Sequence, residues 1–356
     1  MEEDYANETD LQCGYLKSST GCSLPNNVDL RHIEKICTAT LLQGYVLFSV
    51  ALILGLPGSG LVLLTLARMP LRPSILYIRL LAVSDFVSLV FAGISYYNML
   101  DADYVMTDSD HYSKWFGRIF QVLSHWLLVL ICIERYVSVR FPFQKASLFT
   151  IRRSYQTCFI ALSIGSVHFI LFCVGDIERI LKGDLRYFIV LFYLSVYIFL
   201  PMTLIVVFTA LTASELKRNR GRRNSMMAPE HRSLATKLEA DITRMMFLTA
   251  IFFIIFTLPM FLFHLYDRID TYWIHNEYCP LGAAILYHVF YVCASVSFLN
   301  HAANFYIYLF GSPGFRRRFA LSFHRLCREN TSEESMSVSQ IPIRFLRYAR
   351  TSSLNG

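Results

Sequence analysis

Seven long apolar segments recur along the chain, separated by shorter polar ones. They cover residues 43–67, 74–98, 113–136, 155–174, 187–211, 243–266 and 284–310. Each approaches the roughly 20 apolar residues that a helix needs to cross the hydrocarbon core of a bilayer. The third and fourth segments are weaker, because they begin among polar residues. The pattern predicts an all-α membrane protein whose residues 43–311 form a bundle of seven transmembrane helices.

A shorter amphipathic pattern follows the last apolar segment, at residues 312–327. Phe315, Phe319, Phe323 and Leu326 recur at helical spacing, with arginines between them. This arrangement is typical of a helix that lies in the membrane interface. Cys327 comes next, where palmitoylation and a plain free thiol are both plausible. Residues 1–42 and 328–356 are polar, and we expect an extracellular N-terminal segment and a disordered cytoplasmic tail.

Charge is scarce and unevenly distributed. The 356 residues are 54% hydrophobic and 17% charged, whereas soluble domains carry about 25% charged residues. The N-terminus shows no signal-peptide pattern, so the first span is expected to act as its own insertion signal. The loops after the first, third and fifth spans and the tail are basic, whereas residues 101–110 hold four aspartates and no basic residue. By the positive-inside rule, this predicts a multi-pass plasma-membrane protein with its N-terminus outside.

The predicted orientation assigns the modification sites to two sides of the membrane. Asn7 is a glycosylation candidate on the outer side. Cys13, Cys22, Cys37 and Cys279 lie in polar outer segments, where disulfides are expected but three connectivities are open. On the inner side, Ser225 follows two arginines, and Ser335 and Ser337 lie in an acidic tail. These serines suit receptor kinases and arrestin capture, although a merely solvated tail explains them as well.

Asp85 lies inside the second apolar segment, where a carboxylate needs polar partners in the bundle interior. Ser124, Asn300, His301 and Asn304 are predicted at similar depth. They would hold a sodium ion or waters around Asp85, or form a hydrogen-bond network without an ion. The sequence favours neither, and a buried histidine such as His301 is more often simply hydrogen-bonded.

Glu134 and Arg135 stand side by side at the end of the third segment. Charges near a bilayer centre cost several kcal/mol and mark function. Glu239 precedes Pro259 by 20 residues, about 30 Å along a continuous helix, so it reaches the same end of the bundle. Arg135 would pair with these acids as a lock between helices, or it would only extend its guanidinium to water.

Several motifs in a fixed order give the chain a family resemblance. They are LAVSD (81–85), IERYVSVRFP (133–142), a proline in each of the fifth and sixth spans (Pro201, Pro259), NFYIY (304–308) and SPGFRRRFALSF (312–323). Across residues 43–327 the sequence resembles the rhodopsin-like (class A) G-protein-coupled receptors. This resemblance favours the interpretation of Arg135 as a lock between helices over that of an arginine that only extends its guanidinium to water.

The resemblance also implies roles for particular residues. Arg135, in the Glu134-Arg135-Tyr136 motif, would be held by Glu134 and Glu239 at rest and then released to meet a heterotrimeric G protein. Tyr308, in the motif that begins at Asn304, would swing inward on activation. The sodium ion of the family would lie among Asp85, Ser124, Asn300 and Asn304.

The chain departs from the family pattern at several positions. Asp110 replaces the third-helix cysteine, and the short loop at 175–186 has no cysteine, so the usual disulfide is not expected. A Cys37–Cys279 bridge, or pairs within the N-terminal segment, would substitute for it. Ser59, Ser166, Thr257 and Phe305 replace the asparagine, two tryptophans and proline that are common in the family.

Two substitutions narrow the range of possible ligand classes. Phe298 stands where an opsin carries its lysine, and Gly117 stands where a monoamine receptor carries its acid. The motifs are similar to those of invertebrate neuropeptide receptors of the FMRFamide and thyrotropin-releasing-hormone-like groups. The aspartates of the outer loops would steer a cationic, amidated peptide toward the receptor. Alternatively, these aspartates only keep the loops solvated. A lipid or small organic ligand, or no ligand at all, is the alternative. The candidate pocket residues are Tyr96, Tyr97, Arg118, Gln121, His264, Tyr287 and Phe290.

Other function classes receive little support. A transporter would show internal repeats or several intramembrane acids, whereas Asp85 is the one deep acid and no repeat is visible. No HExxH, GxSxG or Walker pattern indicates an enzyme. We expect no nucleic-acid partner, and no cofactor other than the sodium ion considered above.

Overall fold

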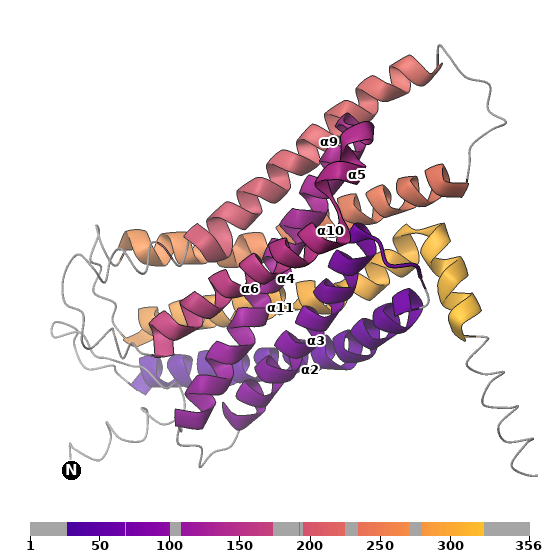
Figure 1. Ribbon diagram of the computed structural model, residues 1–356. Coiled ribbons are helices and arrows are strands. Elements are labelled where there is room, and N and C mark those ends of the chain that lie inside the picture. Colours follow the sequence, from indigo (N-terminus) through magenta and orange to yellow (C-terminus); the bar gives the residue numbers. More distant parts are fainter. Residues whose placement is uncertain are drawn as a thin grey trace, which may run out of the picture.

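The computed structural model describes residues 27–67, 69–99, 108–173, 192, 195–224, 234–270 and 280–323. Within these ranges every regular element is a helix, and the long helices run side by side as one bundle (Figure 1). They are α2 (Asn27–Ala67), α3 (Pro73–Met99), α4 (Asp108–Arg140), α6 (Ile151–Cys173), α9 (Leu200–Asn224), α10 (Leu234–Ile269) and α11 (Pro280–Gly311). This confirms the predicted all-α seven-helix bundle.

Two short elements complete the connections. Helix α5 (Pro142–Leu148) follows α4, and a π-helical turn, η1 (Ser195–Phe199), leads into α9. Residues 313–323 form a last helix after α11, which is the yellow segment in Figure 1. It covers most of the amphipathic helix predicted at 312–327, while Leu326 and Cys327 lie outside the described residues.

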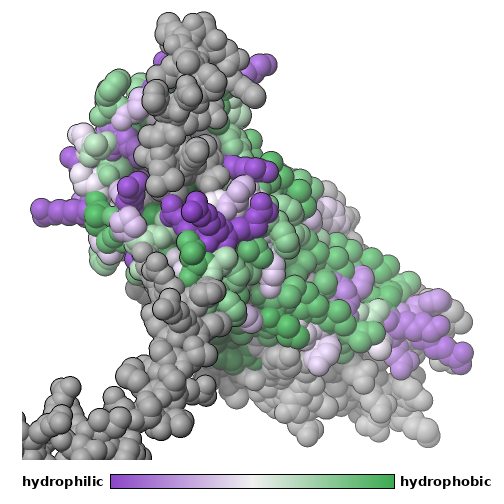
Figure 2. Space-filling view, turned by 90° about the vertical axis from the view of Figure 1, so that its right-hand side faces the viewer, coloured by the Kyte–Doolittle hydropathy of each residue, from purple (hydrophilic) through white to green (hydrophobic). Residues whose placement is uncertain are grey.

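The long helices present an apolar outer surface. Six of them are long and apolar enough to cross a membrane, and α6 is not among these six. Apolar side chains such as Ile53, Phe159 and Ile255 are more than half exposed on the outside of the bundle. Figure 2 shows a broad apolar face lying between two groups of hydrophilic residues. Contiguous apolar surface of this extent indicates contact with lipid.

Helix α2 begins at Asn27, well before the predicted start of the first span at residue 43. Ile33, Cys37 and Thr40 recur at helical spacing and are buried. Ile33 and Cys37 pack against Ala284 of α11, and Thr40 Oγ1 lies 2.8 Å from His288 Nδ1. The polar residues of this stretch gave no sign of a membrane-spanning helix in the sequence. The stretch is nevertheless helical, and its buried face packs against α11.

Close packing joins α2, α3 and α11 at Gly55. A Cβ atom at this position would overlap Leu89 Cδ1 of α3 and would lie 3.0 Å from the backbone Cα of Ala302 in α11. A side chain there would therefore push the helices apart. On the other side of α3, helix α4 occupies the middle of the bundle and packs on α3, α6 and α9.

Two contacts fix the end of the bundle at which α2 finishes. The Arg79 guanidinium of α3 donates to the carbonyl oxygens of Leu66, Ala67 (3.2 Å) and Met69 (2.9 Å). It therefore satisfies carbonyl groups that the end of a helix leaves unpaired. At the same end, the ring of Phe305, which replaces the common proline, packs 5.5 Å from the ring of Phe319 in the last helix.

Candidate functional site

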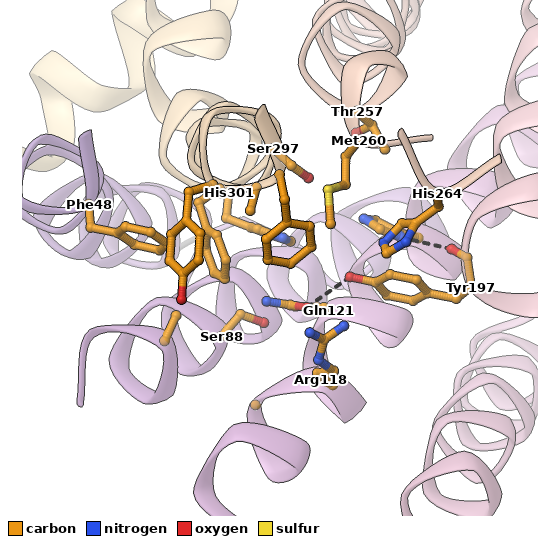
Figure 3. A pocket seen from close by; sticks show the side chains of 17 residues that line it. Phe48, Ser88, Arg118, Gln121, Tyr197, Thr257, Met260, His264, Ser297 and His301 are labelled. Atoms are coloured by element: carbon orange, nitrogen blue, oxygen red, sulfur yellow. Dashed lines mark hydrogen bonds between the residues drawn. The ribbon is translucent and has the colours of Figure 1, made fainter. Parts of the chain in front are cut away.

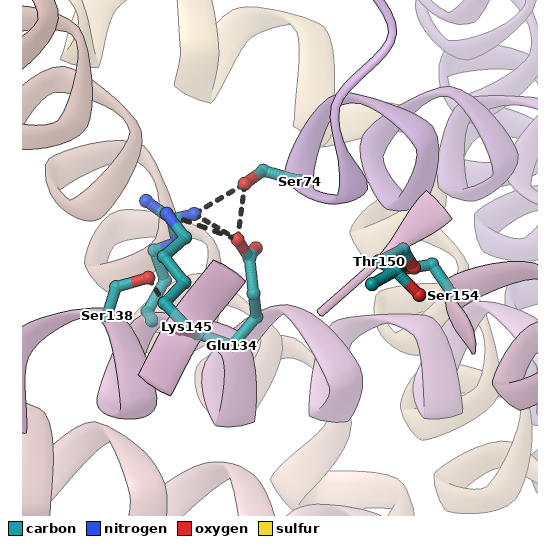
Figure 4. A network of polar contacts seen from close by, with 7 residues as sticks. Ser74, Glu134, Ser138, Lys145, Thr150 and Ser154 are labelled. Atoms are coloured by element: carbon teal, nitrogen blue, oxygen red, sulfur yellow. Dashed lines mark hydrogen bonds and ion pairs between the residues drawn. The ribbon is translucent and has the colours of Figure 1, made fainter. Parts of the chain in front are cut away.

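Glu134 and Arg135 form a buried ionic cluster where α4 approaches its C-terminal end. Both side chains are fully buried, and Arg135 Nη2 lies 2.6 Å from Glu134 Oε1. Ser74 of α3 donates its hydroxyl to the same Oε1 at 2.6 Å and accepts a hydrogen bond from Arg135. Lys145 of α5 approaches Glu134 Oε1 at 3.6 Å. Figure 4 shows Ser74 and Lys145 converging on one carboxylate oxygen of Glu134. We call Ser74, Glu134, Arg135 and Lys145 the Glu134 cluster.

A cavity of about 550 Å³ opens beside this cluster. Arg72, Lys145 and Arg318 line it, together with Glu134 and Ile242 of α10. Glu134 Oε2 is buried without a hydrogen-bond partner in the described part of the chain. A buried ion pair is stable only when further hydrogen bonds satisfy its charges. A movement of Ser74 or Lys145 away from Glu134 would therefore destabilise the Glu134–Arg135 pair.

The other residues predicted for the switch are placed as follows. Tyr136 packs against Phe141 and Phe208, with ring centroids 6.4 Å and 5.8 Å away. Glu239 and Pro259 lie in the same continuous helix, α10, but the side chain of Glu239 is outside the described residues. Tyr308 is buried, 3% exposed, in the core of the bundle.

Asp85 is the centre of a second polar cluster, in the middle of the bundle. Its Oδ1 accepts hydrogen bonds from Ser124 Oγ at 2.7 Å and from His301 Nδ1 at 2.8 Å. Its Oδ2 accepts one from Asn304 Nδ2 at 2.6 Å. We call these four residues the Asp85 cluster. Asn300, the remaining predicted member, is buried but makes no hydrogen bond to Asp85 within the described contacts.

A cavity of about 240 Å³ lies between the Asp85 cluster and the end of the bundle opposite the Glu134 cluster. Arg118, Gln121 and His125 of α4 line one side of it, at helical spacing on a single face. The imidazole of His301 lines its floor, so the cavity touches the Asp85 cluster directly (Figure 3). The other lining residues are Phe48, Ser88, Ala92, Gly117, Tyr197, Thr257, Met260, His264, Phe290, Tyr291, Ala294, Ser297 and Phe298.

Four of the seven predicted pocket residues line this cavity: Arg118, Gln121, His264 and Phe290. Tyr287 is not among the lining residues, and its ring packs on Tyr291 at 4.6 Å instead. The side chains of Tyr96 and Tyr97 lie outside the described residues. His125 and Tyr197 were not predicted. His125 follows Gln121 by four residues, so the helical periodicity of α4 could have indicated it.

Pro201 explains why His125 contacts the backbone of Tyr197 in the turn before α9. Pro201 has no backbone N–H, so the carbonyl of Tyr197, four residues earlier, lacks its usual helical partner. His125 Nδ1 lies 3.2 Å from this oxygen, so its N–H can donate to the freed carbonyl. The Tyr197 hydroxyl donates to Gln121 Oε1 at 2.8 Å. Pro201 thereby helps to fix one wall of the cavity.

The chemistry of the cavity is mainly apolar with a few polar groups. Arg118 is the one formally charged side chain among its described lining residues, and none of those residues is an acid. The buried hydroxyls of Ser88 and Thr257 have no hydrogen-bond partner in the described part of the chain. At Gly117 a Cβ atom would lie 2.9 Å from Phe91 Cβ, so the position that holds an acid in monoamine receptors has no room for one here.

The predicted modification sites are described only in part. Cys37 is disulfide-bonded, and its partner is not among the cysteines whose side chains are described. Cys132, Cys158 and Cys293 are free thiols. Asn7, Cys13, Cys22, Ser225, Cys279, Cys327, Ser335 and Ser337 all lie outside the described residues, so the predictions about them stay predictions.

Comparison with known proteins gives one family. No curated protein matches the chain. Residues 58–308 match the family described as "7 transmembrane receptor (rhodopsin family)", and this range contains both polar clusters and most of the cavity. The match covers more than half of the 356 residues. It excludes the transporter alternative, and it places the chain among signalling receptors rather than enzymes. The chain belongs to the rhodopsin family of seven-transmembrane receptors, the class A G-protein-coupled receptors.

Proposed function

We propose that this receptor is activated by an extracellular neuropeptide, one end of which enters the 240 Å³ cavity, and that it opens the Glu134 end of the bundle to a heterotrimeric G protein. The observation that carries the signalling part is the fully buried ion pair between Glu134 and Arg135. Ser74 of α3 and Lys145 of α5 reach the same carboxylate. Such a pair is a two-state element, because moving the helices exchanges its partners.

The orientation follows from the position of the basic residues. Arg72, Lys145 and Arg318 gather at the Glu134 end, and basic residues are typical of the cytoplasmic side. We therefore place the Glu134 cluster at the cytoplasmic surface and the His264 end of the cavity toward the outside. The cavity by the Glu134 cluster would then receive the G protein when α10 moves away from α4.

The peptide ligand is supported by the chemistry of the cavity. Its described lining holds Arg118 and no carboxylate, so a cationic group would find no counter-charge there. An amidated aromatic terminus has no charge, and its carboxamide can pair with the hydroxyls of Ser88 and Thr257, which have no hydrogen-bond partner among the described residues. The cationic part of such a peptide would remain among the acidic outer loops, at residues 101–110 and 267–279. The cavity volume has room for the end of a peptide only.

A lipid or small organic ligand is the second candidate. Aromatic and apolar groups make up much of the lining, among them Phe48, Met260 and Phe298. Ligand pockets of this kind hold apolar molecules and use a small number of polar groups to orient them. A carboxylate on such a ligand would find its counter-charge at Arg118.

The ligand assignment can be tested by screening a neuropeptide library on cells that express the receptor and a G protein, with nucleotide exchange as the readout. Thr257→Trp fills the cavity and should lower the potency of an active peptide at least tenfold. Leu262→Trp is the matched control, because Leu262 lies in the same helix and is 52% exposed on the outside of the bundle. A response to lipid extracts and to no peptide would favour the second candidate.

Arg135→Ala tests the signalling part separately. It removes the guanidinium of the Glu134 cluster and should abolish nucleotide exchange while surface expression persists. Normal exchange in this variant would contradict the proposed switch, whichever ligand is found.

Regulation from the cytoplasmic side belongs to the same proposal. Phosphate on Ser225, Ser335 or Ser337 would add negative charge beside a basic surface, and we expect receptor kinases and arrestin to use the two tail serines. Alanine at both tail positions should reduce arrestin recruitment and leave nucleotide exchange unchanged.

A further inference from the structure

A sodium ion beside the deep aspartate is implied by the family, and the Asp85 cluster can be tested for its fit. Hard cations bind to oxygen lone pairs. Here both oxygens of Asp85 already accept hydrogen bonds, and all three donors are N–H or O–H groups: Ser124 Oγ, His301 Nδ1 and Asn304 Nδ2. Asn304 presents its nitrogen to Asp85, rather than its amide oxygen. With the N–H groups of His301 and Asn304 directed at the carboxylate, the arrangement of these residues does not fit a sodium ion bound to Asp85.

His301 is the group that makes the difference. Its Nδ1 lies 2.8 Å from Asp85 Oδ1, and its side chain is 4% exposed. The imidazole supplies an N–H donor at a point where a cation would need an acceptor. Asp85 is fully buried, so its carboxylate needs a compensating partner. The imidazole provides that partner from within the chain.

The position of His301 is fixed from its other sides. The His125 ring stacks on it, with centroids 6.0 Å apart and planes at 12°, and Phe298 packs at 6.1 Å. His125 is itself held by the Tyr197 carbonyl. The imidazole therefore has little freedom to turn away from Asp85 and admit an ion.

We infer that the imidazole of His301 takes the place of the sodium ion, and that the Asp85 cluster is not a sodium site. The polar centre of the bundle is held by a side chain of α11 rather than by an exchangeable ion. Because His301 also lines the ligand cavity, a ligand that reaches the cavity floor touches the partner of Asp85 directly. This inference rests on the Asp85 cluster and does not depend on which ligand is bound.

The test needs no ligand. The thermal unfolding midpoint (Tm) of the detergent-purified full-length receptor is measured in NaCl and in choline chloride at equal ionic strength. We expect the same Tm in both salts for the wild type. His301→Ser removes the imidazole and supplies a hydroxyl oxygen, so this variant should gain a saturable rise in Tm of about 2 °C or more with sodium. Asp85→Asn in the His301→Ser background should abolish that gain.

A saturable, sodium-specific rise in Tm for the wild type would overturn the inference. So would the lack of any sodium effect in folded His301→Ser. If that variant does not fold, His301→Asn takes its place, since its amide oxygen can also bind the ion. The comparison of salts within each variant separates sodium binding from any general loss of stability.

Discussion

Ser74 Oγ lies 2.6 Å from Glu134 Oε1 and also accepts a hydrogen bond from Arg135. A single hydroxyl from α3 thus contacts both charges of the ion pair in α4. Hydrogen bonds to charged groups contribute about 1.5–3 kcal/mol net. The serine therefore ties the ion pair to a neighbouring helix, and it should stabilise the arrangement seen here relative to an opened one.

Ser74→Ala should raise ligand-independent nucleotide exchange. The variant removes one hydrogen bond from each charge, and a loss of about 1.4 kcal/mol shifts an equilibrium about tenfold. Basal exchange on a co-expressed G protein, normalised to surface expression, is the measurement. Ser138→Ala is the control, because the Ser138 hydroxyl donates only to the Glu134 backbone oxygen of its own helix, at 2.8 Å. Equal basal exchange in the two variants would count against the role of Ser74.

Gly55→Ala should lower the thermal stability of the receptor. The added Cβ would meet the Leu89 side chain and the Ala302 backbone, and overpacking of this kind costs about 1–3 kcal/mol. Gly60→Ala, in the same helix, should instead raise the thermal stability. Apart from the backbone of its own helix and its chain neighbours, no described atom lies within 4 Å of a Cβ at Gly60, and glycine to alanine in a helix gains up to about 1 kcal/mol. Thermal unfolding of the two purified variants checks both directions, and a destabilised Gly60→Ala with an unaffected Gly55→Ala would refute the packing argument.

Phe305→Ala should loosen the last helix. The Phe305 ring is 5% exposed and packs against Phe315 and Phe319 at 6.2 Å and 5.5 Å. Removal of a buried aromatic ring typically costs about 3–5 kcal/mol. Hydrogen exchange of residues 313–323 should therefore accelerate in the variant. Phe310→Ala is the control, because Phe310 is 71% exposed; similar exchange in both variants would rule out this anchor.

The long helices could be predicted from the sequence because each apolar run carries its own signal. The ends of these helices could not be predicted, because a polar stretch can extend a helix when a neighbouring helix covers one of its faces. The stretch before residue 43 reads as polar, and the burial of Ile33 and Cys37 depends on α11, far along the chain. The π-helical turn at Ser195–Phe199 has only the later Pro201 as its sequence signal.

The sites show the same division. Glu134 and Arg135 stand out because charge is rare at such positions, whereas Ser74 is an ordinary serine, 60 residues away from Glu134. His301 was recognised as a polar residue at the depth of Asp85, but its contact spans 216 positions. The polar groups that donate hydrogen bonds to Asp85 are determined by how α3, α4 and α11 pack together. No local sequence pattern predicts that packing.

Cys37 should form its disulfide with Cys279. Cys37 is bonded and is buried beside Ala284 and Leu281 in the first turns of α11. Cys279 directly precedes Pro280, the first residue of that helix. Bridged cysteines have Cα atoms within about 7 Å of each other, and of the cysteines with undescribed side chains Cys279 is the one adjacent in sequence to the helix that Cys37 touches. Such a bridge would tie α2 to α11 at the end of the bundle opposite the Glu134 cluster.

Replacing either cysteine by serine should then destabilise the receptor equally, by about 2–4 kcal/mol. The double variant should be no less stable than either single one, because both changes remove the same bond. Cys293→Ser in α11 is the control, since its thiol is free. Peptide mapping without reduction identifies the pair directly, and recovery of Cys37 joined to Cys13 or Cys22 would show that the bridge lies within the N-terminal segment instead.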